Sequence, residues 1–271
     1  MTARPAMPPD TAAPALFVSH GSPMLAIEDC PARRFLADYG AGLPAPSAII
    51  VASAHWETAA PTLSTAPRPA TIHDFGGFPD ALYALDYPAP GAPGVAVAAA
   101  RRLRAAGLTA DTDDGRGLDH GAWVPLRLMI PDADIPVVSL SVQPMAGPAH
   151  HLAVGRALAP LRDEGVAILG SGALTHDLRT LFGTRPELDA APPSWVTDFA
   201  DWVAEAVAAG RIDDLVHYRC RAPHAARNHP TEEHVLPLFV ALGAGGPGAA
   251  GARVHSSTTY GLLAMDAFAF G

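Results

Sequence analysis

Four of the twelve histidines share a setting that suits them for metal binding. Three lie at or shortly after the end of a short apolar run, and the fourth stands where a helix is predicted to begin. They are His20, His55, His176 and His234. Short apolar runs predict buried strands, and open α/β sheets bind ligands beyond the carboxyl ends of their strands. Imidazole suits iron, zinc and copper, so the pattern predicts a metalloenzyme.

Two further histidines lie in segments that combine an acid, glycines and aromatic side chains. His73 is followed by Asp74, and His120 is preceded by Asp119. Such segments suit the wall of a pocket for a planar polar ligand. Asp119 could equally cap the helix that follows it, and Asp74 could form a turn. We expect both histidines to be candidates for the site, His120 more than His73.

Two glutamates directly before His234 leave the ligand set open. Many Fe(II) sites that activate oxygen use two histidines and one carboxylate, so Glu232 or Glu233 could be the third ligand. Both also fall in the first turn of a predicted helix, where acids are favoured by the helix dipole without any metal. Spacing alone does not show whether one of the glutamates or His234 is the third metal ligand.

The elements that must position these residues alternate along the chain. The predicted strands are 15–19, 47–53, 136–142 and 166–170, with one or two more after 249; the predicted helices include 95–106, 118–129, 148–162, 194–209 and 232–242. This alternation predicts a three-layer α/β/α fold, with a mostly parallel or mixed sheet and the metal site at the carboxyl ends of the strands. We expect one catalytic domain over 1–271, in which 1–13 form a flexible extension. The long loop 56–94 is expected to be functional.

Composition excludes several classes of protein. The net charge of −9 argues against a nucleic-acid surface, which needs clustered cations. All 18 basic residues are arginine, which excludes Schiff-base, pyridoxal-phosphate and P-loop lysine chemistry. The two cysteines have no metal-binding or disulfide spacing, and there is neither a signal peptide nor a membrane-spanning stretch. We therefore expect a cytoplasmic protein without a membrane or nucleic-acid partner; nothing in the sequence indicates its oligomeric state.

Short motifs along nearly the whole chain resemble one family. They are FVSHGSPM (17–24), SAHW (53–56), IHDFGGFP (72–79), YPAPG (87–91), DHG (119–121), PDADIP (131–136), GSG (170–172) with His176, and PT (230–231) with His234. Their combination and order resemble the class III extradiol ring-cleavage dioxygenases, in the branch named for DOPA 4,5-dioxygenase. The resemblance implies an α/β fold with one non-haem divalent metal, a small aromatic diol as substrate, and O₂.

The resemblance also implies roles for individual histidines. His20, His55 and His234 correspond to the metal ligands. His176 corresponds to a base that in some members becomes a fourth ligand, and His120 to an acid. Because histidine replaces the glutamate of related enzymes, the site is less negative, and Zn(II) as well as the Fe(II) needed for activity is expected there. A neutral histidine is suited to take a proton from a catechol at neutral pH.

The substrate pocket and the overall activity are open to more than one interpretation. Trp56, Phe75, Phe78 and Trp123 could enclose an aromatic ring, and His73 could line the pocket beside them. A carboxylated catechol would favour a nearby arginine, for which Arg227 and Arg179 are candidates. The alternatives to ring cleavage are a zinc-dependent hydrolase, with a metal-bound water and His176 as base, and a metal-binding protein without turnover.

Overall fold

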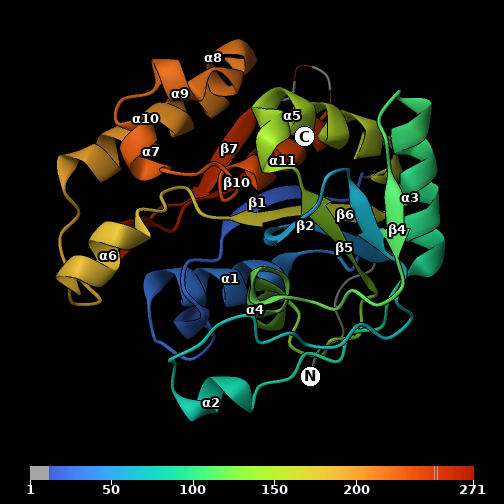
Figure 1. The fold of residues 1–271 in the computed structure, drawn as a ribbon, viewed down its shortest axis with the longest axis horizontal. Coiled ribbons are helices and arrows are strands. Elements are labelled where there is room, and N and C mark those ends of the chain that lie inside the picture. Colours follow the sequence, from blue (N-terminus) through green and yellow to red (C-terminus); the bar gives the residue numbers. More distant parts are fainter. Residues whose placement is uncertain (1–11, 247, 249) are drawn as a thin grey trace.

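An eight-stranded sheet crosses the centre of the molecule (Figure 1). The computed structural model describes residues 12–246, 248 and 250–271. The four central strands are β5 (Val137–Val142), β2 (Ala48–Glu57), β6 (Val166–Gly172) and β1 (Ala15–Ser19), in that order and all parallel. Beyond β1 lie the antiparallel strands β10 (Ala267–Phe270) and β7 (Gly251–His255); beyond β5 lie β3 (Thr62–Ser64) and β4 (Asp111–Asp113). The predicted mixed, mostly parallel sheet is confirmed.

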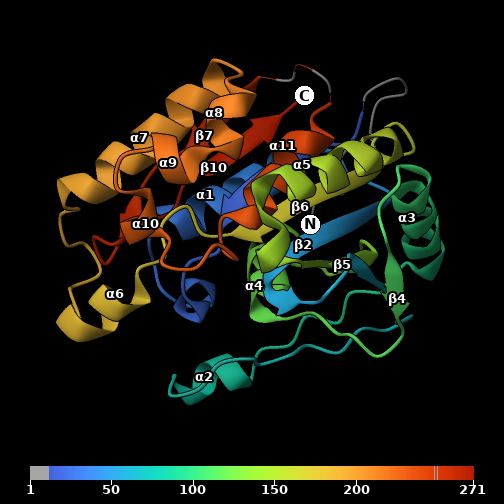
Figure 2. The ribbon, with the colours of Figure 1, turned by 45° about the horizontal axis from the view of Figure 1, so that its top comes forward.

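Helices cover both faces of the sheet, which makes the predicted three layers (Figures 1 and 2). One face packs against α3 (Pro93–Ala105), α5 (Gly147–Leu158), α7 (Ser194–Ala208) and α11 (Leu236–Ala244). The other packs against α1 (Pro31–Gly42) and α4 (His120–Met129). Side chains alternate along each strand, so Ile50 enters the first core and Ile49 the second. Burial on both faces explains why the central strands are continuous apolar runs.

Shorter elements connect these layers. They are the 3₁₀ helices η1 (Pro23–Ala26), η2 (Pro144–Ala146) and η3 (Ala159–Leu161), the helices α2 (Asp80–Tyr83), α6 (Leu178–Thr184), α8 (Ile212–Val216), α9 (Tyr218–Arg221) and α10 (Ala225–Asn228), and the paired strands β8 (Thr258–Thr259) and β9 (Leu263–Ala264). No helix within the described residues is long and apolar enough to cross a membrane.

Two of the boundaries that differ from the prediction bear on the site. Strand β2 continues to Glu57, so His55 lies within the strand and not after it. Helix α11 begins at Leu236, not at Glu232, because Pro237 stands in its first turn. A helix that began at Glu232 would place this proline in its interior, at a cost of about 3 kcal/mol. Glu232, Glu233 and His234 therefore precede the helix, and the prediction that both acids lie in its first turn is wrong.

The predicted N-terminal extension lies mostly outside the described residues, which begin at residue 12. Ala13, which was included in that extension, is fully buried. Its N–H donates to the carbonyl of Arg162 at 2.9 Å, and the Arg162 guanidinium donates back to the carbonyl of Ala13 at 2.5 Å. Ala13 therefore belongs to the folded core.

Helices α5 and α11 contact each other through their backbones. A Cβ atom on Gly155 of α5 would lie 2.1 Å from the carbonyl oxygen of Val240, and one on Gly243 of α11 would lie 2.3 Å from that of Leu152. Neither carbonyl belongs to a flexible side chain, so the space cannot be opened without moving a helix. This contact holds α11, and the segment just before it, close to the sheet.

Replacing Gly155 by alanine should therefore lower the free energy of unfolding by about 1–3 kcal/mol, the usual penalty for overpacking. Alanine otherwise stabilises a helix interior by about 1 kcal/mol relative to glycine. A loss of stability instead of a gain would therefore itself indicate the backbone contact. Urea unfolding measures it. The control is Gly94→Ala in α3, where nothing lies within 4 Å of the added Cβ and stability should hold or rise. Equal stability of Gly155→Ala and the unmodified protein would contradict the backbone contact.

Candidate metal centre and its cavity

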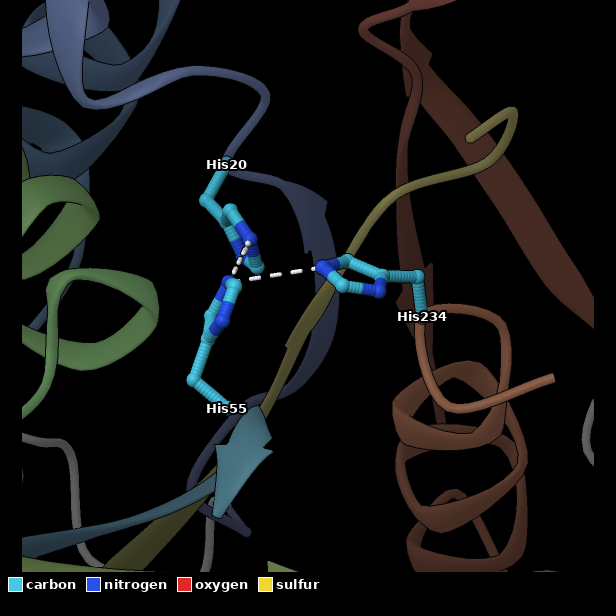
Figure 3. A group of neighbouring side chains, drawn as sticks. All are labelled: His20, His55 and His234. Atoms are coloured by element: carbon cyan, nitrogen blue, oxygen red, sulfur yellow. Dashed lines mark hydrogen bonds between the residues drawn. The ribbon is translucent and has the colours of Figure 1, made fainter. Parts of the chain in front are cut away.

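Three imidazoles from distant parts of the chain point their Nε2 atoms at one another (Figure 3). His20 follows β1, His55 lies near the end of β2, and His234 lies just before α11. The Nε2 atoms of His20 and His55 are 2.9 Å apart, and those of His55 and His234 are 3.3 Å apart. The carboxyl ends of parallel strands thus bring two of the three histidines together, as the sequence predicts.

Two glycines of β6 allow the third histidine to reach this point. A Cβ on Gly172 would lie 2.1 Å from the carbonyl oxygen of His234, and one on Gly170 would lie 2.1 Å from that of Pro237. The carbonyl of His234 accepts a hydrogen bond from the N–H of Ala173 at 2.9 Å. The GSG motif is therefore the surface on which the His234 segment lies.

The second nitrogen of two of these rings is held by a polar neighbour. Nδ1 of His20 lies 3.0 Å from the hydroxyl oxygen of Ser171, and that hydroxyl donates in turn to the carbonyl of Gly121. Nδ1 of His234 lies 2.9 Å from a carboxylate oxygen of Glu233. Both contacts place the proton on Nδ1 and leave the Nε2 lone pair free. Metal-binding histidines are commonly oriented by partners of this kind.

Burial keeps the three rings neutral. Burial, followed by the neighbouring histidines, lowers the pKa of His20 and of His234 well below the usual value. For His55, burial and then His120 lower the pKa to about 3, although Asp74 acts in the opposite direction. Since a histidine must be neutral to bind a metal, all three are ready to do so at neutral pH.

The donor set fits a single divalent ion. Two nitrogens that are each about 2.0–2.1 Å from one zinc ion lie roughly 3 Å apart, which is the spacing of these Nε2 atoms. Three protein ligands with an open side are typical of a catalytic site, whereas structural sites are closed by four. The three residues also form one of the groups whose ligand atoms all lie within 4.8 Å of one another.

The two glutamates do not join the three converging nitrogens. Glu232 accepts a hydrogen bond from the hydroxyl of Tyr218 at 2.8 Å. Glu233 contacts the Nδ1 atom of His234, on the far side of that ring from its Nε2 atom. Of the ligand sets that the sequence left open, the geometry favours the one with His234.

His176 lies directly against a proposed ligand. Its ring stacks on that of His234, with centroids 3.4 Å apart and planes at 16°. Its Nδ1 is 3.8 Å from Glu233, which is too long for a hydrogen bond. Burial lowers the pKa of His176 to about 4, more than Glu233 raises it. His176 is thus a neutral imidazole at physiological pH.

Asp74 holds His120 at two points. One carboxylate oxygen accepts the backbone N–H of His120 at 2.9 Å, and the other lies 3.0 Å from its Nδ1. Burial raises the pKa of Asp74, but the hydrogen bond and charge of His120 outweigh it and lower the pKa to about 2. The ring of His120 lies 3.9 Å from that of His55, centroid to centroid. Asp74 is therefore more than a turn-former: it is an ionised partner for His120 beside the metal site.

Asp119, in contrast, has the structural role that its position before a helix predicts. Its carboxylate accepts the N–H of Ala122 as the N-terminal cap of α4, and it also accepts the hydroxyl of Ser53 at 2.6 Å. It is fully buried and paired with Arg116.

A cavity of about 370 Å³ opens onto these histidines. His55, His120, His176 and His234 line it, and its walls are mainly apolar. The wall residues include Met24, Phe75, Phe78, Leu178, Leu181, Phe182, Leu263, Arg185 and Tyr260. Phe75 and Phe78 come from the long loop 56–94, which also supplies Asp74, so this loop contributes to the site as its length suggested.

Several residues expected at the pocket lie elsewhere. Trp56 is buried beneath the guanidinium of Arg116, which lies 5.1 Å from its ring. Nε2 of His73 lies 3.0 Å from the carbonyl of Leu85, and the ring packs behind Phe75 and Trp123. Trp56, His73 and Trp123 therefore do not line the cavity, whereas Phe75 does.

The predicted arginines are also displaced from the cavity. The guanidinium of Arg227 lies over the ring of Trp195 at 4.0 Å, because an arginine stacks readily on an indole. Arg179 is exposed on α6 and does not line the cavity either. The arginine that does line it is Arg185, at the end of α6. Arg185 and Tyr260 were not singled out from the sequence, which carries no local signal for their placement.

Comparison with known proteins agrees with this geometry. Residues 14–269 match the family described as the catalytic LigB subunit of aromatic ring-opening dioxygenase. A protein of Beta vulgaris named 4,5-DOPA dioxygenase extradiol is 43% identical over 258 residues, or 94% of this chain and 95% of that protein. A protein of Escherichia coli (strain K12) with the same name is 44% identical over 86% of both chains.

The fold also matches a solved structure. An uncharacterized protein of Escherichia coli K12 superposes with a TM-score of 0.78 at 34% identity, over 96% of this chain and all of that one. The family match spans the strands and loops that supply all three converging histidines. The chain therefore belongs to the LigB family of aromatic ring-opening dioxygenases, within the class III extradiol group that its motifs resemble.

Proposed function

We propose that the enzyme cleaves a carboxylated catechol beside its two hydroxyls, at one Fe(II) ion held by His20, His55 and His234. The main support is the convergence of three neutral Nε2 atoms beside an apolar cavity, which is lined by two of these histidines, His55 and His234, and by His120 and His176. Zinc fits the same three nitrogens, but it has no redox chemistry. We therefore infer that Fe(II) supports turnover and that Zn(II) gives an inactive form.

When bound, the metal would supply the place where the catechol oxygens and O₂ meet. His176 is neutral and lines the cavity, so it can accept a proton from a catechol hydroxyl. His120 lines the cavity with its Nδ1 atom 3.0 Å from the Asp74 carboxylate, so it is placed to pass a proton to the product. Phe75 and Phe78 enclose the ring and exclude water.

The other two interpretations of the sequence have less support. A zinc-dependent hydrolase would need no apolar cavity for an aromatic ring, and a protein that only binds metal would need neither His120 nor His176. The names of the related proteins are those of dioxygenases.

The two cysteines are free, Cys30 buried and Cys220 exposed. We therefore propose that the protein works in a reducing compartment such as the cytoplasm.

Oxygen uptake tests the proposed function directly. Protein loaded anaerobically with Fe(II) should consume one O₂ for each carboxylated catechol and form a yellow ring-opened product, and zinc-loaded protein should consume none. An oxygen electrode and absorbance spectroscopy follow the two signals together. A stoichiometric Fe(II) content without uptake for any catechol would refute the proposal and favour hydrolysis or binding.

His176→Ala should keep the metal and lose turnover. Removal of a general base typically costs about 10²- to 10⁴-fold in kcat, whereas the three Nε2 ligands remain. Metal content by mass spectrometry and kcat by oxygen uptake separate the two effects. His55→Ala is the comparison, because it removes a ligand and should lose the metal. If His176→Ala also lost its metal, His176 would be a ligand and not a base.

Asp74→Asn should reduce kcat about 10²-fold with little loss of bound metal. An asparagine can still accept the backbone N–H of His120, but it removes the carboxylate charge that lies 3.0 Å from Nδ1 of that ring. Asp74 lies 3.0 Å from Nδ1 of His120 and 3.7 Å from Nδ1 of His55. The substitution should therefore affect His120, the proposed acid, more than His55, the proposed ligand. Asp80→Asn, at an exposed position in α2, is the matched control. If the metal content fell as much as kcat, the main role of Asp74 would be to hold the proposed ligand His55 rather than His120.

A further inference from the structure

One permanently charged side chain lines the cavity. Apart from its histidines, the lining residues within the described part of the chain include a single cation, Arg185, and no carboxylate. Asp74 and Glu233 contact the site histidines but are not lining residues, and neither is Glu28, to which the Tyr260 hydroxyl donates at 2.6–2.7 Å. A ligand in the cavity therefore meets a fixed positive charge that no lining acid neutralises.

Arg185 occupies this place in an unusual backbone conformation. It ends α6 with φ 45° and ψ 58°, in the left-handed region. Helices commonly end in this conformation, but usually with glycine, which has no Cβ to clash. The following residue is Pro186, and a residue before proline favours extended conformations. An arginine here is more costly than a glycine, and such strain is often retained for function.

The guanidinium of Arg185 is free to bind a ligand. Within the described residues its side chain makes no hydrogen bond or ion pair; only its backbone N–H is engaged, by the carbonyl of Leu181 at 2.9 Å. Other arginines are committed to the fold: Arg162 donates to three buried carbonyls, and Arg253 pairs with two aspartates.

Helix α6 connects Arg185 to the reactive end of the cavity. The helix follows His176 after one residue, its N-terminal cap Asp177, and its side chains Leu178, Leu181 and Phe182 form one wall. Seven residues at 1.5 Å each give this wall a length of about 10 Å, so His176 and Arg185 stand at opposite ends of it. Figures 1 and 2 place α6 at the outer edge of the molecule.

We propose that Arg185 is the specificity-determining residue of the enzyme, which binds the carboxylate on the side chain of the catechol. The diol would lie at the histidines, the ring between the apolar walls, and the acid at the guanidinium, which binds a carboxylate through paired hydrogen bonds. This inference rests on the proposed function, because it takes the ligand to be a catechol, and it replaces Arg227 and Arg179 in that role.

The test compares one acid with its own ester. Steady-state oxygen uptake is measured with 3,4-dihydroxyphenylacetate and with its methyl ester, which keeps the diol and ring but lacks the charge. Arg185→Gln should raise KM for the acid about 10- to 100-fold, the value of a charge-assisted pair, with kcat little changed and the ester unaffected. Arg179→Gln, on the same helix but outside the cavity, should behave as the unmodified enzyme.

A second variant guards against a change in folding. Arg185→Gly removes the side chain and relieves the left-handed conformation, so its unfolding midpoint should equal or exceed that of the unmodified protein while the acid preference is lost. Equal losses for acid and ester in both variants, or no loss in either, would overturn the assignment.

Equilibrium binding separates this inference from the proposed function. The acid and the ester are titrated into iron-loaded protein without O₂, and binding is followed by calorimetry. Binding of the acid that depends on Arg185, without turnover under O₂, would refute ring cleavage but support Arg185 as the anion site. Turnover of the acid with unchanged KM in Arg185→Gln would refute the role of Arg185 and leave ring cleavage intact.

Discussion

The site depends on the close approach of two backbones, those of β6 and α5, to helix α11 and the segment before it. The carbonyls of His234 and Pro237 lie where a Cβ on Gly172 or Gly170 would stand, so the segment before α11 rests directly on the end of β6. The α5–α11 contact through Gly155 and Gly243 holds the helix from the other side. Without both contacts, His234 could not meet two histidines that are more than 170 residues away in the sequence. Small residues on β6 and α5 thus position His234, a proposed ligand that neither element carries.

Neutral and charged groups occupy different places in the site: neutral nitrogens face its centre, and carboxylates lie behind the rings. The nitrogens that face the metal position are neutral because they are buried. The carboxylates of Asp74 and Glu233 lie behind the rings, where they orient one proposed acid and one proposed ligand. The carboxylates therefore lie behind the rings, while the lining of the cavity, within the described residues, consists of four imidazoles, mainly apolar side chains, the hydroxyl-bearing Ser22 and Tyr260, and Arg185.

Much of this arrangement could be predicted, because strand periodicity and the position of His20 and His55 at strand ends are local features of sequence. The residues that were misplaced depend on contacts that sequence patterns do not encode. Arg227 was expected at the substrate and instead stacks on Trp195. Arg185 lines the cavity from the C-terminal end of α6, where its backbone adopts a left-handed conformation. The start of α11 could have been predicted from the sequence, because Pro237 is tolerated only in the first turn of a helix and so limits how early the helix can begin.

The three facing Nε2 atoms have a thermodynamic consequence beyond catalysis. Their lone pairs converge in a buried place, which an unfolded chain has no reason to assemble. Any ion that binds there binds the folded state alone, and at a hundred times its dissociation constant it would add about 2.7 kcal/mol to the stability. The cell's supply of the metal would then govern how long the protein survives as well as how fast it turns over.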